Sequence, residues 1–161
     1  MGMMLIKGDE TPQDIICLAY GLEEGLRKFY AGTSQLAIEA EVSAVLARLA
    51  EIEVRHKQKL FDLFKTVESA DMTVESFEKK VNAELMEGGF DSGTLLEEMG
   101  PAFKTAVDVL NFAMMLEAQG MDLYLRYAEK SENPKVREIL FEMAEDEKAH
   151  LKSLGNLMEK I

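Results

Sequence analysis

The stretch AEIEVRHKQKLFDL at residues 50–63 decides the fold, because it recurs in altered form as AEDEKAHLKSLGNL at residues 144–157. At a fixed offset of 94 residues, the segments that begin at Ile15 and Val109 align for 50 positions without a gap. Twelve of these pairs are identical, and five of the twelve are polar or charged, which a shared apolar pattern alone would not require. The chain is therefore predicted to contain an internal repeat.

Each half of the repeat predicts two long helices, because apolar residues recur at spacings of three and four. Three prolines mark helix starts, since proline suits the first helical position; they follow Thr11, Gly100 and Asn133. We predict helices at 12–37, 40–68, 102–130 and 134–160.

Residues 69–101 form a connection too long for a tight turn. Thr73 with Phe77 and Thr94 with Glu97 predict two short helices there, separated by the glycines at 88, 89 and 93. A connection of this length can return along the bundle and leave the second and third long helices parallel. The prediction is a single all-α domain, residues 1–161, folded as a four-helix bundle made of helix pair 12–68, crossover 69–101 and helix pair 102–160.

Composition narrows the class of protein. With 47% hydrophobic residues the chain can bury a core, and its single cysteine, Cys17, excludes an internal disulfide and a four-thiolate iron site. The net charge of -12 disfavours nucleic acid and anionic membranes as partners. No apolar run approaches the roughly 20 residues of a membrane span. We expect a soluble, cytoplasmic protein, and apolar patches on the long helices favour a homodimer.

The two histidines of the chain each stand three residues after a glutamate, as Glu53 with His56 and Glu147 with His150. This helical spacing puts both side chains of a pair on one face. The repeat also pairs two further acids, Glu23 and Glu117, each of which lies two turns before a tyrosine. Four helices therefore each offer one glutamate, and two of them also offer a histidine.

These acids occupy core-facing positions among leucines and alanines. Four carboxylates inside one bundle would each cost several kcal/mol if unpaired. Two divalent cations would balance their charge, so the pattern favours a two-metal site over ordinary pairs on a helix surface. Mixed oxygen and nitrogen ligands suit iron or manganese and tolerate zinc.

With these residues the chain resembles the rubrerythrin branch of the ferritin-like superfamily over nearly all of its length. The wider class takes one glutamate from each of two helices and a Glu-x-x-His motif from each of the other two. The resemblance implies a ferritin-like bundle with two iron ions, bridged by the catalytic residues Glu53 and Glu147. The six ligands that it implies are Glu23, Glu53, His56, Glu117, Glu147 and His150.

Two departures from typical rubrerythrins bear on activity. Gly120 stands where such proteins have a further glutamate, three residues after the ligand of the third helix. The sequence also lacks the cysteines of a rubredoxin domain. Both features predict that electrons come from a separate donor protein.

Three more residues are candidates for supporting the metal site. Tyr30 and Tyr124 are predicted either to hydrogen-bond beside the metals or to pack as core aromatics. Asp146 can accept a hydrogen bond from His56, as acids at this position do in related bundles, or can be an exposed carboxylate. Its counterpart in the first half of the repeat is Ile52, so any such support is one-sided.

The leading functional hypothesis is a di-iron protein that reduces hydrogen peroxide, or O2, in defence against oxidative stress. An alternative within the class is a ferroxidase or iron-handling protein. An alternative from another class is a non-catalytic helical interaction bundle whose site holds zinc or stays empty. Redox turnover with bound iron separates the first two from the third.

Overall fold

The computed structural model describes residues 8–36, 39–87 and 102–161. Within these ranges the chain is helical and contains no strand, which confirms the predicted all-α fold. The helices are α1 (Pro12–Thr33), α2 (Ala40–Val67), α3 (Val74–Glu87), α5 (Ala106–Lys130) and α6 (Pro134–Lys160).

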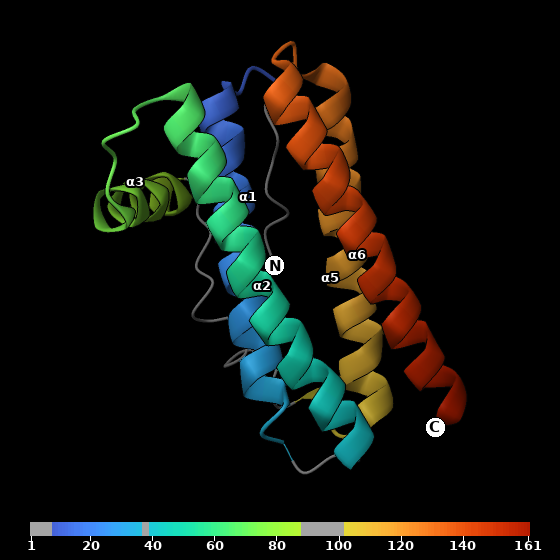
Figure 1. The fold of residues 1–161 in the computed structure, drawn as a ribbon. Helices are drawn as coiled ribbons and strands as arrows, with labels where there is room; N and C mark the ends of the chain where they lie inside the picture. The colour runs from blue at the N-terminus through green and yellow to red at the C-terminus, as the bar shows by residue number, and fades with distance from the viewer. Residues whose placement is uncertain (1–7, 37–38, 88–101) are drawn as a thin grey trace.

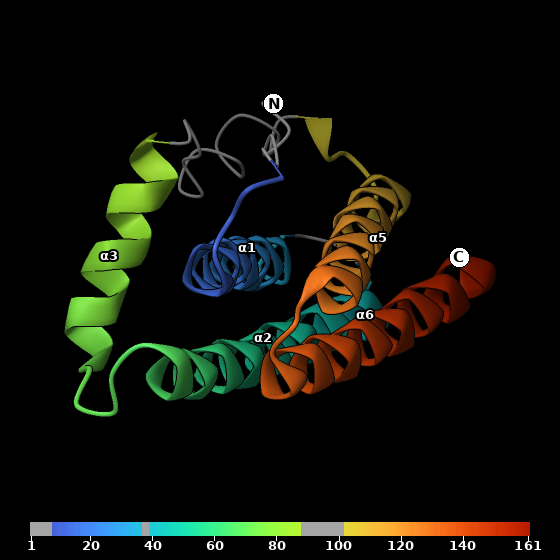
Figure 2. The same cartoon turned by 90° about the horizontal axis from the view of Figure 1, so that it is seen from above.

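The long helices form two antiparallel pairs, α1 with α2 and α5 with α6 (Figure 1). Seen from above, α1 lies beside α5 and α2 lies beside α6, while α3 crosses the first pair on the side away from the second (Figure 2). Helices α2 and α5 run parallel, as the long connection between the pairs predicts.

Capping residues fix the helix starts. Thr11, which precedes Pro12, forms a capping box with Asp14. The side chain of Asn133, which precedes Pro134, accepts hydrogen bonds from the backbone N–H groups of Lys135 and Val136. Thr73 caps α3 as predicted, because its hydroxyl oxygen accepts from the backbone N–H of residue 76 at 3.2 Å. The predicted signals at Gly88, Gly89, Gly93, Thr94, Glu97 and Pro101 lie outside the described residues.

Two predicted helix boundaries are wrong by about one turn. Helix α1 ends at Thr33 rather than at residue 37. At this end the hydroxyls of Thr33 and Ser34 donate to backbone carbonyls of the last turn. Helix α5 begins at Ala106 rather than at residue 102, because Thr105 and Asp108 supply a complete capping box there.

The buried apolar side chains form two clusters at opposite ends of the bundle. One cluster includes Ile16, Leu60 and Met143, and the other includes Leu26 and Leu110. Between the two clusters the core changes from apolar to charged, and the candidate site residues lie in this middle layer. No helix in the described ranges is both long and apolar enough to cross a membrane.

Candidate metal centre

The six predicted ligands converge in the middle of the bundle. Helices α1 and α5 each contribute one glutamate, and α2 and α6 each contribute a glutamate and a histidine. All four glutamates are completely buried, whereas His56 and His150 are 2% and 5% exposed. Such burial of ionisable groups is rare unless they are paired or bind a metal.

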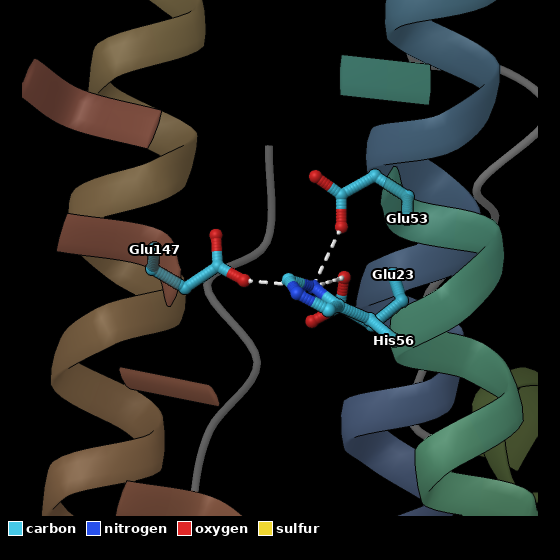
Figure 3. A group of neighbouring side chains, drawn as sticks. All are labelled: Glu23, Glu53, His56 and Glu147. Atoms are coloured by element: carbon cyan, nitrogen blue, oxygen red, sulfur yellow. Dashed lines mark hydrogen bonds and ion pairs between the residues drawn. The ribbon is translucent and has the colours of Figure 1, made fainter. Parts of the chain in front are cut away.

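The first group of donor atoms surrounds His56. Its Nδ1 atom lies 3.3 Å from Glu23 Oε2, 3.0 Å from Glu53 Oε2 and 3.2 Å from Glu147 Oε1. Figure 3 shows Glu147 reaching across from α6, while Glu23 and Glu53 approach from the helix pair that carries His56. One imidazole nitrogen thus faces three carboxylates from both halves of the chain.

The second group repeats this arrangement around His150. Its Nδ1 atom lies 3.3 Å from Glu117 Oε2, 3.4 Å from Glu147 Oε2 and 3.5 Å from Glu53 Oε1. Each of the carboxylates of Glu53 and Glu147 therefore directs one oxygen to the first group and the other oxygen to the second. This is the arrangement expected of carboxylates that bridge two ions.

The donor atoms fit metal ions by distance and by unmet bonding. Metal–ligand bonds of about 2.0–2.2 Å place neighbouring donor atoms roughly 3.0–3.5 Å apart, as observed here around both histidines. One N–H group cannot donate to three carboxylates at once. Indeed, within the described ranges both oxygens of Glu53 and of Glu147 are buried without a hydrogen-bond partner, although each lies close to a histidine nitrogen. Metal ions would satisfy these four oxygens.

The electrostatics of the site favour proton uptake when no metal is bound. Burial and the neighbouring carboxylates raise the pKa of Glu53 to about 12 and that of Glu117 to about 8. Burial alone would lower the histidine pKa values, but the surrounding carboxylates raise that of His150 to about 9 and that of His56 strongly. Burial alone would raise the pKa of Glu147, but its contacts with Glu117 and both histidines lower it to about 2.

Both predicted tyrosines hydrogen-bond to the site, and they do so across the two halves. The Tyr30 hydroxyl on α1 donates to Glu117 Oε1 on α5, and the Tyr124 hydroxyl on α5 donates to Glu23 Oε1 on α1. Both side chains are completely buried. Each tyrosine therefore fixes the carboxylate of the opposite helix, which decides between the two roles predicted for them.

Asp146 also meets its predicted partner, because its Oδ2 atom lies 3.3 Å from His56 Nε2. Sequence reasoning missed Lys59, whose Nζ atom donates to the same carboxylate oxygen at 3.2 Å. Lys59 follows His56 by three residues on α2, a spacing that could have indicated a shared helix face. At Gly120, an added Cβ would lie 3.6 Å from Leu22 Cδ2 and 3.9 Å from Glu147 Cγ, so the glycine is not required by space.

Fold and site together define a helical bundle with a buried carboxylate–histidine centre suited to binding metal, iron included. The family model for rubrerythrins matches residues 108–161, which carry half of the donor set, and so confirms the predicted resemblance to this family for that part of the chain. The first half of the repeat carries the other donors outside this match. Comparisons with curated proteins and with solved structures gave no match.

Proposed function

We propose that this chain is a non-haem di-iron redox protein that reduces hydrogen peroxide with electrons from a separate donor protein. The observation that carries the proposal is the pair of overlapping donor groups, which share Glu53 and Glu147 and present histidine Nδ1 at either end. Two adjacent ions match a reaction that consumes two electrons.

Charge and ligand type support two divalent ions. Four carboxylates carry four negative charges, two such ions carry four positive charges, and imidazole ligands are neutral. We expect Glu23 and His56 to hold one ion, Glu117 and His150 to hold the other, and the two shared carboxylates to bridge them. The oxygen and nitrogen donors suit iron, with manganese or zinc as substitutes.

With two ferrous ions bound, the centre would supply one electron per ion, enough to convert hydrogen peroxide and two protons into two molecules of water. The chain's own side chains prepare the site for this reaction. Complete burial of the four carboxylates excludes bulk water. The hydroxyls of Tyr30 and Tyr124 orient Glu117 and Glu23 by donating to one carboxylate oxygen of each.

The test begins with metal analysis of anaerobically purified protein. Ferrous protein is then mixed with hydrogen peroxide or O2 in a stopped-flow spectrometer. We expect rapid oxidation by peroxide, and loss of this reaction in Glu53→Ala and Glu147→Ala, because each substitution removes a bridging carboxylate. Glu51→Ala and Glu145→Ala are matched controls, since both residues are exposed on the same helices, and they should react as the wild type does.

Two results would contradict the proposal. If the wild-type protein reacts with neither oxidant, or if the bridge variants react as fast as the wild type, the non-catalytic bundle becomes the better explanation. If O2 oxidises many added ferrous ions per protein while peroxide is ineffective, the chain is a ferroxidase, and iron is a substrate rather than only a cofactor.

A further inference from the structure

A groove of about 480 Å³ lies on the outer side of the two histidines, lined by residues of α2 and α6, which run side by side (Figures 1 and 2). Both histidine rings line it, together with Arg48, Arg55 and Lys59 from α2. The volume is within the range of about 300–1,000 Å³ typical of sites for small molecules.

The two histidines differ in how their outer nitrogens are used. Both direct Nδ1 toward the carboxylates, so both turn the Nε2 edge away from them. His56 Nε2 meets Asp146, whereas no hydrogen bond or ion pair joins His150 Nε2 to any residue that the structure describes. The repeat explains the difference, because the counterpart of Asp146 beside His150 is Ile52, which also lines the groove.

The charges of the groove are unbalanced in favour of cations. Of its three basic side chains only Lys59 has a carboxylate partner, Asp146, at 3.2 Å. Arg48 and Arg55 are exposed, and neither forms an ion pair within residues 8–36, 39–87 and 102–161. In a chain of net charge -12, two such arginines beside a buried imidazole form a local site for negative charge.

We propose that this groove binds a small oxyanion, a carboxylate or phosphate group, that accepts a hydrogen bond from His150 Nε2 and pairs with Arg48 and Arg55. The bound oxyanion would supply to His150 the acceptor that Asp146 supplies to His56. When Nδ1 binds a metal, Nε2 carries the remaining hydrogen of a neutral imidazole and is a donor. Arginine is suited to pairing with such an anion, because its planar guanidinium group can donate two parallel hydrogen bonds to a carboxylate or a phosphate.

The first experiment measures anion binding by calorimetry at low ionic strength, with inorganic phosphate in one arm and citrate in the other. The two arms show whether phosphate or carboxylate is preferred. We expect the wild-type protein to bind the anion. The double variant Arg48→Gln/Arg55→Gln should bind it at least about tenfold more weakly, because charge-assisted hydrogen bonds are lost. Arg126→Gln is the control, since this exposed arginine of α5 pairs with Asp122 away from the groove. It should leave the affinity unchanged.

A second variant tests the position of the anion. Ile52→Asp places a carboxylate at the position that corresponds to Asp146, so it should compete internally and abolish anion binding. Because the chain has only two histidines, nitrogen-15 NMR of the imidazoles should resolve both rings. On adding the anion we expect the Nε2 signal of His150 to shift while that of His56 changes little.

The proposal is overturned if neither anion binds, if the double arginine variant binds as tightly as the wild type, or if only the His56 signal responds. Binding of an acidic polypeptide without binding of either small anion would also overturn it, in favour of a protein-docking surface. The titrations are made on metal-free and zinc-loaded protein. A chain that holds no metal would contradict the proposed function, yet would leave the arginine test intact.

Discussion

Replacing Glu53 by glutamine should change stability in opposite directions with and without metal. In the metal-free protein, burial and repulsion raise the pKa of Glu53 from 4.5 to about 12, so the folded chain holds a proton at pH 7 that the unfolded chain has released. Each pH unit above 4.5 costs about 1.4 kcal/mol, which amounts to about 3–4 kcal/mol at pH 7. Glutamine is neutral and avoids this cost. We therefore expect Glu53→Gln to raise the free energy of unfolding of metal-free protein by about 3–4 kcal/mol at pH 7.

The pH profile tests the cause. Because the folded-state pKa is raised, the penalty is absent below pH 4.5 and grows as pH rises, so wild type and variant should converge near pH 4.5 and separate toward pH 7. Urea denaturation across this range measures the difference, with exposed Glu51→Gln as the control. With metal bound the same variant should be less stable than wild type, because it loses an anionic bridging ligand. A metal-free variant that is less stable than wild type at pH 7 would refute the reasoning.

Three further substitutions have defined outcomes. Tyr30→Phe should lower the free energy of unfolding by about 1–3 kcal/mol because it leaves a buried carboxylate oxygen unpaired, whereas Tyr127→Phe should be nearly neutral, since the Tyr127 hydroxyl has no partner among the described residues. Asp146→Ala should weaken metal affinity about 10–100-fold in a competition titration with a chelator, because His56 loses the acceptor that orients it. Gly120→Ala should raise the free energy of unfolding by about 0.5–1 kcal/mol, since the added methyl group meets only ordinary contacts and the helix gains a better helix former.

The sequence was sufficient to predict the four long helices and the convergence of the six donor residues. This was possible because identical polar residues occupy equivalent core-facing positions in both halves of the repeat. In addition, the spacing of Glu-x-x-His puts both side chains on one face of a helix. The helix ends were less predictable. Pro101 suggested a start at residue 102, whereas the local hydrogen bonds of Thr105 and Asp108 placed it at Ala106.

Contacts between helices were beyond sequence reasoning. The partner of each tyrosine depends on how α1 and α5 pack, and periodicity does not specify that α1 hydrogen-bonds to the acid of α5. Likewise, the groove beside His150 arises because α2 and α6 lie side by side. Arg48 and Arg55 stand seven residues apart, a spacing that puts them on one face of α2, but nothing in the sequence places His150 of α6 beside that face.

The reciprocal hydrogen bonds from the tyrosines of α1 and α5 to each other's glutamates have an evolutionary consequence. Neither helix pair can complete the centre alone, since each needs the other's tyrosine and bridging carboxylate. If the repeat arose by duplication of one hairpin, the half-length ancestor had to form a symmetric dimer to bind metal in this way. Fusion of the two copies would then allow each position to vary separately. Asp146 and Ile52, which are equivalent by the repeat and opposite in chemistry, would be one such divergence.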